Sequence, residues 1–258
     1  MNNSELKKKL ESHYRAYRKK FSSKDPVWNL YKFSAPEDIE LAGLVTAAFS
    51  YGSVDQINAF LEQLFTKTGK NLHEFTINFS KHKDKKYFEG LYYRFNSGND
   101  IIEMFCALQL VLKKYGRIKN FFMGCYSKND VNILNALSKF SEGLNKNIPA
   151  AESRYYFYLF SDPGNKSTCK RMNLFLRWMV RKDEIDTGLW NEIGTANLIM
   201  PVDTHIARIS KSLGLVNRKT IDLNFAIELT EKLKKFDGSD PVKYDFALCH
   251  IGIDKKDF

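Results

Sequence analysis

Apolar residues recur every three or four positions over most of the chain, which is the spacing of helices that bury one face. The clearest case is residues 100–115, where apolar side chains cover a wide face. No stretch alternates apolar and polar residues as a half-buried strand would, so we predict no strand. The spacing predicts further helices over residues 4–21, 36–52, 53–69, 70–79, 131–144, 150–160, 222–236 and 241–251, with a short loop or turn at 121–126.

The most apolar predicted helix covers residues 170–181. Its apolar side chains occupy most of the circumference, so we expect this helix to be buried. Its cations Lys170, Arg177 and Arg181 fall on a single stripe. The two arginines either pair with carboxylates elsewhere in the chain, or pack their stems while their charged ends reach solvent.

A second segment with candidate chemistry is P-V-D-T-H, residues 201–205, which precedes apolar residues at helical spacing and ends at Gly214. Asp203 or Thr204 is well placed to cap the helix by accepting from its first amides. Capping does not exclude a chemical role for Asp203. His205 either orients a phosphate or forms a hydrogen bond within the first helical turn.

Composition fits a folded protein with an anionic partner. The 258 residues are 43% hydrophobic and 14% aromatic, which is typical of a globular chain and not of a disordered one. Forty lysines and arginines against thirty acidic residues give a net charge of +10. Such an excess suits nucleic acid, although surplus lysine also serves solubility.

The order of these two segments carries a resemblance. A lysine-opened apolar helix followed by V-D-T-H-I-x-R-I resembles the core of the helix-hairpin-helix DNA glycosylase superfamily, which includes endonuclease III and the 8-oxoguanine glycosylases. On that pattern Lys170 falls where bifunctional members place their Schiff-base lysine, and Asp203 falls on their essential aspartate. The stretches LAGLVTAAFSYG and KYDFALCHIGI also resemble a bacterial family of uncharacterised proteins associated with that superfamily.

The resemblance implies an all-α fold of two helical subdomains with the site in a cleft between them. The expected parts are an N-terminal helix, residues 1–35, that packs with the C-terminal helices, a helical subdomain, 36–160, and a helix-hairpin-helix-like segment, 161–258. The usual L-P-G-x-G hairpin is replaced by DPGNKSTC at residues 162–169, which has one glycine. We therefore expect a degenerate hairpin.

The implied activity is base-excision repair: a DNA glycosylase with abasic-site lyase activity through a lysine Schiff base. Lys170 would be the nucleophile, and Asp203 would stabilise positive charge on the sugar and help move protons. The implied partner is double-stranded DNA with a damaged base or an abasic site. The residues expected to contact DNA are Gly164, Lys166, Ser167, Thr168, Arg171, Arg177 and His205.

Two other functions stay open at this stage. The degenerate hairpin favours a non-catalytic DNA-binding relative, whereas Lys170 and Asp203 favour an enzyme because binding alone needs neither. An all-α enzyme acting on a small anionic substrate is the third possibility, although the chain has no phosphate-binding loop and no acid pair.

The remaining sequence features concern cofactors and location. Cys106, Cys125, Cys169 and Cys249 are far apart and lack metal-ligand spacing, so we expect reduced thiols, no iron–sulfur cluster and no other metal or cofactor. The N-terminus has no apolar core of a signal peptide, and no apolar run is long enough to span a membrane. We expect a cytoplasmic, nucleoid-associated monomer.

Overall fold

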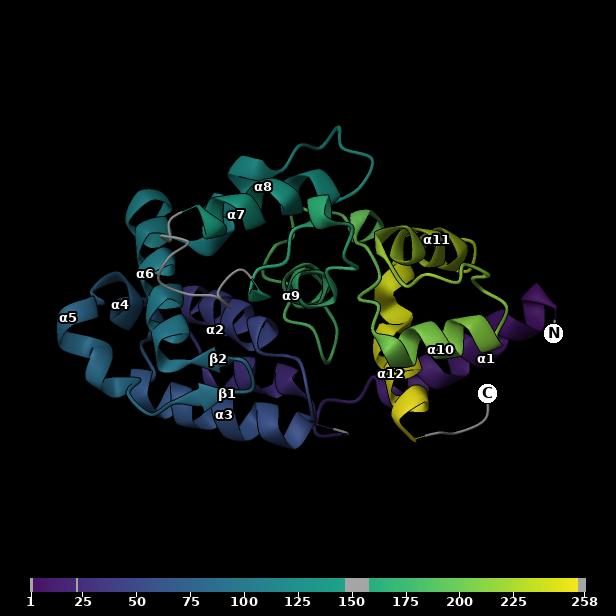
Figure 1. Ribbon diagram of the computed structural model, residues 1–258. Coiled ribbons are helices and arrows are strands. Elements are labelled where there is room, and N and C mark those ends of the chain that lie inside the picture. The colour runs from purple at the N-terminus through teal and green to yellow at the C-terminus, as the bar shows by residue number, and fades with distance from the viewer. Residues whose placement is uncertain (1, 22, 147–157, 255–258) are drawn as a thin grey trace. The chain divides into compact units, whose positions relative to one another are not determined.

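The structure is a computed structural model that describes residues 2–21, 23–146 and 158–254 (Figure 1). These residues are mostly helical, which confirms the all-α prediction. The predicted helix 150–160 lies outside the described residues as far as residue 157. The chain forms two compact units, residues 1–23, 128–134 and 163–258 in the first and 24–127 and 135–162 in the second. Residues 24–35, which the predicted boundaries place with the N-terminal helix, thus belong to the second unit.

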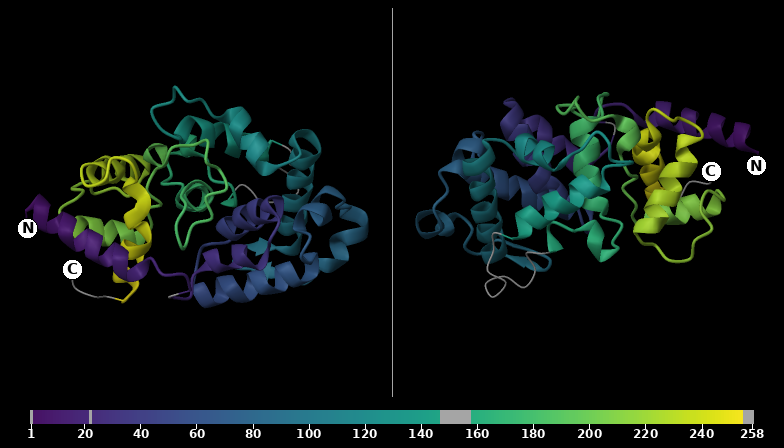
Figure 2. Two further views of the ribbon diagram at one scale, coloured as in Figure 1. Left: turned by 180° about the vertical axis from the view of Figure 1, so that it is seen from behind. Right: turned by 90° about the horizontal axis from the view of Figure 1, so that it is seen from above.

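The first unit contains both segments with candidate chemistry. Its N-terminal helix α1 packs on α12 (Figure 2), and α12 also packs on α10. Leu6 and Leu10 are the buried side chains of α1, and the Tyr14 ring meets that of Tyr244 edge to face at 6.4 Å. The elements are α1 (Asn3–Tyr17), η4 (Pro163–Asn165), α9 (Lys170–Val180), η5 (Thr195–Asn197), α10 (Thr204–Ser212), α11 (Leu223–Lys234), η6 (Pro241–Tyr244) and α12 (Asp245–Asp254).

The second unit is organised around α2, whose side chains from Leu41 to Ala48 are fully buried. Small residues on α2 let η1, α4 and α7 approach it. The elements are η1 (Pro26–Lys32), α2 (Pro36–Ala48), α3 (Val54–Thr68), α4 (Leu72–Ile77), α5 (Lys81–Asp84), η2 (Lys85–Tyr87), β1 (Tyr92–Tyr93), β2 (Asn96–Ser97), α6 (Gly98–Tyr115), α7 (Ile118–Cys125) and α8 (Leu134–Asn145), the last from residue 135 onward.

Two predictions for the second unit are wrong. Residues 121–126 were expected in a loop or turn, but residues as far as Cys125 belong to helix α7, which buries Ile118, Phe121 and Phe122 at helical spacing. No strand was expected, yet β1 and β2 form an antiparallel hairpin with Tyr92 opposite Ser97. Each strand has two residues, which is too short to show an alternating pattern.

Candidate functional site

The connection that leads into α9 is fastened to two other segments of the first unit. The Thr168 hydroxyl donates to the Val202 carbonyl at 3.1 Å, which ties this connection to the segment before α10. The Leu223 amide donates to the Lys166 carbonyl at 3.0 Å and ties it to the start of α11. These bonds bring the first residues of α9 and α10 together, although they are more than thirty positions apart in the sequence.

Lys170 and Asp203 meet at this point. The Lys170 Nζ lies 3.5 Å from the Asp203 Oδ2, and the two side chains are 31% and 20% exposed. The other oxygen, Asp203 Oδ1, accepts from the Ile206 amide at 2.9 Å and caps α10. One carboxylate oxygen therefore fixes the side chain while the other faces the amine. The pair is accessible enough to meet a substrate and still ordered by the fold.

Three of the residues expected to contact DNA are exposed just before α9: Gly164, Lys166 and Ser167. The Ser167 Oγ accepts from the Cys169 amide at 3.2 Å, so its hydrogen can still be donated to a phosphate. The hydrogen of Thr168 is donated to Val202, so this hydroxyl fastens the connection and cannot donate to DNA at the same time.

The backbone of this connection has no glycine at its left-handed positions. Lys166 has φ 58° and Cys169 has φ 49°, and both are residues for which such angles are uncommon. Gly164 is not among the residues with positive φ. Cys169 stands at the N-cap of α9, and its side chain makes no capping hydrogen bond.

The remaining predicted DNA contacts divide between the surface and the interior. His205 is exposed on the first turn of α10. Arg171 is buried, and Arg177 is only 3% exposed. The Arg177 Nε donates to Asp186 Oδ1 at 3.2 Å, and its Nη1 pairs with Asp245. Burial leaves no guanidinium surface for a phosphate, so the prediction that Arg177 contacts DNA is corrected: this arginine pairs with carboxylates.

Arg181 extends the same ion-pair network by one turn. It binds Asp183 and Asp240, each at 3.0 Å, and also pairs with Asp186. Burial alone would lower the pKa of Arg181, but the three surrounding carboxylates raise it above its ordinary value. Through their ion pairs with buried carboxylates, Arg177 and Arg181 together hold the C-terminal half of α9 in the interior of the unit.

Asp245 is the residue of this region that the sequence patterns missed. It opens α12 and is almost fully buried, and this burial raises its pKa to about 6. Arg177 and Lys170 lower that pKa and Asp203 raises it, so Asp245 lies within electrostatic reach of the Lys170 and Asp203 pair. In the sequence Asp245 follows a short turn and has the pattern of an ordinary helix start. The one available signal was the pair of arginines on a buried helix, which requires buried carboxylates somewhere.

The described part of the chain has neither a cluster of metal-ligating side chains nor a membrane-spanning helix. Residues 2–21, 23–146 and 158–254 contain no group of three His, Cys, Asp or Glu side chains placed to hold a metal ion. None of the helices in these ranges has both the length and the apolar character needed to cross a bilayer.

Comparison with known proteins gives a family. A family model described as "Protein of unknown function (DUF2400)" matches residues 25–254, so it covers most of the chain. A search of curated proteins and a search of solved structures each found no match.

Proposed function

The chain belongs to the DUF2400 family, and we propose that it is a DNA base-excision glycosylase with abasic-site lyase activity, related to the helix-hairpin-helix glycosylases. The observation that carries the proposal is the 3.5 Å distance between the Lys170 Nζ and the Asp203 Oδ2. A nucleophilic amine beside a carboxylate is the pair of groups that this reaction requires.

Lys170 is the proposed nucleophile. As the bond between the base and C1′ of the sugar breaks, its electron pair leaves with the base, which takes up a proton. Positive charge develops on the sugar, and the Asp203 carboxylate stabilises it. The Lys170 amine then forms a bond to C1′ and gives up a proton, which Asp203, 3.5 Å away, can accept.

Opening of the sugar ring then yields a protonated Schiff base between Lys170 and C1′. This cation acidifies the hydrogen on C2′. Loss of that proton expels the phosphate on the 3′ side, so the strand is cut while Lys170 stays attached to the sugar. Hydrolysis by water releases the amine. The steps require Lys170, water, and groups that both accept and return protons: the leaving base and the opened ring oxygen each take up a proton, while the Lys170 amine and C2′ each release one.

The proposed DNA contacts lie at the starts of α9 and α10. The exposed Lys166 supplies positive charge, the Ser167 hydroxyl supplies a hydrogen-bond donor, and Gly164 lets the backbone come close. His205 faces solvent on α10 and is placed to take a second phosphate. Such contacts position a duplex without reading its sequence.

A non-catalytic DNA-binding protein is the second candidate. It is favoured by the backbone before α9, where the left-handed positions are occupied by Lys166 and Cys169 and not by glycine. Because a helix-hairpin-helix uses its glycines to approach a phosphate, this departure weakens the argument for the usual phosphate contact. A protein of this kind would bind duplex DNA with an affinity that falls steeply as salt rises, and it would form no covalent adduct.

The deciding experiment is borohydride trapping on a duplex oligonucleotide with an abasic site. Borohydride reduces a Schiff base to a stable amine, so a covalent adduct reports attack by a lysine. We expect an adduct with the wild type and none with Lys170→Ala. Lys182→Ala is the matched control, because Lys182 is an exposed lysine just beyond the same helix, and it should give the wild-type yield.

Two results would contradict the proposal. An adduct that persists in Lys170→Ala would place the nucleophile elsewhere. Absence of any adduct with the wild type, while the duplex still binds at low salt, would remove the lyase step, and a panel of damaged bases would then separate a glycosylase without lyase activity from the non-catalytic protein. Lys166→Ala should weaken duplex binding and leave adduct formation intact at saturating protein.

A further inference from the structure

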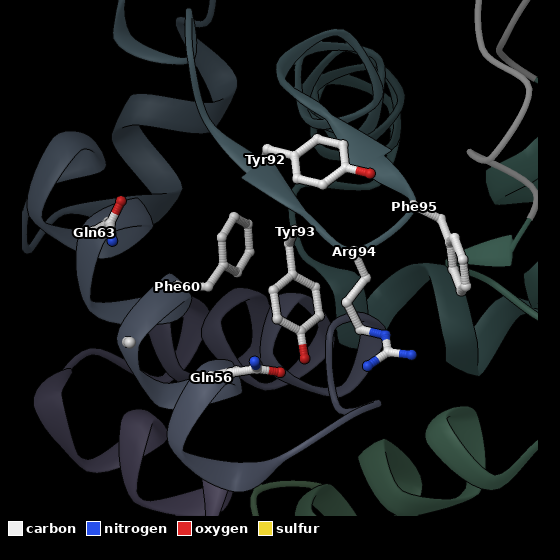
Figure 3. Close-up of a pocket in the computed structure, with 8 residues that line it drawn as sticks. Gln56, Phe60, Gln63, Tyr92, Tyr93, Arg94 and Phe95 are labelled. Carbon is white, nitrogen blue, oxygen red and sulfur yellow. The ribbon is translucent and has the colours of Figure 1, made fainter.

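The second unit carries a pocket at the β1–β2 hairpin, where the hairpin lies against α3 (Figure 3). The pocket has a volume of about 610 Å³, which is within the range of small-molecule sites. Aromatic side chains from two elements line it: Phe60 of α3, and Tyr92 and Tyr93 of the hairpin. All of these residues belong to one unit, so the pocket does not depend on how the two units are placed.

The aromatic lining combines a fixed surface with an exposed one. The rings of Phe60 and Tyr93 are packed at 4.9 Å between centroids, and Figure 3 shows them side by side. Tyr92 is 67% exposed and Phe95 is 49% exposed, which is unusual for large aromatic side chains at one hairpin. Phe60 and Tyr93 are buried and support the hairpin, and the exposed rings of Tyr92 and Phe95 are the ones that can stack on a planar ligand.

Arg94 places a positive charge at the same pocket. It occupies the hairpin turn with φ 54°, a left-handed angle that favours glycine. Its guanidinium lies 5.9 Å from the Tyr51 ring centroid and 5.6 Å from that of Phe95. Over the described ranges, no acidic side chain forms an ion pair with Arg94. Arginine is strained at a backbone angle that favours glycine, and strained residues are often functional, which favours a role for the Arg94 guanidinium in binding a ligand.

Two exposed glutamines complete the pocket. Gln56 and Gln63 both project from α3, and Figure 3 shows Phe60 and Tyr93 between Gln63 on one side and Arg94 on the other. Each glutamine amide offers a donor and an acceptor. The pocket therefore provides stacking surfaces, groups that can pair with the edge of a heterocycle, and a cation for an anionic group.

We propose that this pocket binds a nucleotide, with the base against the exposed rings of Tyr92 and Phe95 and the phosphate on Arg94. The nucleotide comes either from solution or from an unpaired position in a nucleic-acid strand, since both present the same base and phosphate. The proposal is independent of the reaction at Lys170, because it rests on residues of the second unit alone.

Calorimetric titration of the full chain tests the proposal. The probes are adenosine monophosphate, adenosine, inorganic phosphate and a short single-stranded oligonucleotide. We expect Tyr92→Ala to weaken binding of adenosine monophosphate or the oligonucleotide by about five- to 150-fold, the range of single base-stacking contacts. Arg94→Gly should weaken the phosphate-bearing probes and leave any adenosine binding unchanged. Glycine adopts the left-handed angle without strain, so this variant should fold.

Tyr87→Ala is the matched control. Tyr87 belongs to the same unit and also has a cation over its ring, with the Lys86 Nζ 5.4 Å from the ring centroid, but Tyr87 does not line the pocket. This variant should bind as the wild type does. Binding of free adenosine monophosphate would identify a soluble nucleotide, and binding of the oligonucleotide alone would identify a strand. The proposal is overturned if no probe binds at millimolar concentration, or if the Arg94 and Tyr92 variants bind as tightly as Tyr87→Ala. A Lys170→Ala chain should bind the probes normally whatever the trapping experiment shows.

Discussion

Arg177 and Asp245 form an ion pair in which both side chains are almost fully buried, at 3% and 6% exposed. The pair joins α9 to the start of α12, and Arg177 also binds Asp186 at 3.1 Å. The cationic stripe of residues 170–181 therefore has two different roles. Its arginines hold α9 in the interior, and its lysine alone faces Asp203 at an accessible position.

Arg177→Met should destabilise the protein strongly. Removal of the cation leaves Asp186 and Asp245 buried without this partner, and breaking a buried ion pair from one side costs about 3–5 kcal/mol. Urea unfolding followed by circular dichroism measures the loss. Arg218→Met is the control, since its ion pair with Asp222 lies at the surface, and this variant should unfold close to the wild type. A stable Arg177→Met protein that has lost DNA affinity would instead return Arg177 to the DNA-contacting surface.

Stability should fall as pH rises through the titration of Asp245. Burial raises the pKa of this carboxyl to about 6, from 3.8 in the unfolded chain. Between these values the folded state holds a proton that the unfolded state has lost. The contribution of Asp245 to the free energy of unfolding is therefore fully present below about pH 4. Up to about 3 kcal/mol of it is lost as pH rises to about 6.

Asp245→Asn should remove that part of the pH dependence, as measured by urea unfolding across this range. Asp237→Asn should remove a pH dependence of the opposite sign, in which the free energy of unfolding falls as pH falls. Although burial favours its neutral form, hydrogen bonds from Lys243 and Ser239 lower the pKa of Asp237, so its contribution is lost as pH falls. An unchanged pH profile in Asp245→Asn would show that Asp245 titrates at its ordinary value.

Two substitutions at Asp203 should separate capping from chemistry. Asp203→Asn keeps an oxygen for the Ile206 amide, so its stability should stay near that of the wild type. Asp203→Ala loses the cap and should unfold with about 1 kcal/mol less free energy. Both remove the carboxylate beside Lys170, and single-turnover base excision should slow by about 10²–10⁴-fold in each. Equal activity in Asp203→Asn and the wild type would reduce Asp203 to a helix cap.

Gly52→Ala should disturb the nucleotide pocket through the backbone. Gly52 has φ 99°, and an added Cβ would lie 3.0 Å from the Tyr93 hydroxyl and 3.1 Å from Arg94. We expect about 1–2 kcal/mol lower stability from the left-handed angle, together with weaker nucleotide binding. Gly116→Ala shares the positive φ but meets nothing within 4 Å, so it should lose stability and keep the binding. Equal binding in both variants would show that the hairpin tolerates the contact.

The helices that could be predicted are those with a capping residue and a regular apolar face. The predicted helix 53–69 is α3, with Ser53 as its cap and Gly69 at its end, and Asp203 and Asp222 likewise cap α10 and α11. Residues 26–32 form a 3-10 helix without such a pattern, and the last predicted helix begins as the 3-10 turn η6. Local signals identify helices well and their irregular ends poorly.

The candidate site was predictable only in part. Lys170 and Asp203 were selected by their order in the chain, and they lie 3.5 Å apart, while their chemistry stays a prediction. The partners of Arg177 could not be identified, because Asp186 and Asp245 are 9 and 68 positions away in sequence. Which buried carboxylate meets which buried arginine depends on the packing of α9 against α12, and no periodicity within a single helix records it.

The ion pairs at the C-terminal half of α9 also determine how Lys170, its first residue, is oriented around the helix axis. Each residue of an α-helix adds about 100° of rotation, so Lys170 and Arg177 differ by about two full turns and point the same way. A single residue inserted between them would preserve every side chain of the site and every ion pair of the network. It would nevertheless turn Lys170 by about a quarter of the helix circumference, away from Asp203. The ion pairs of Arg177 and Arg181 thus fix the rotation of α9 about its axis, and with it the direction in which Lys170 points.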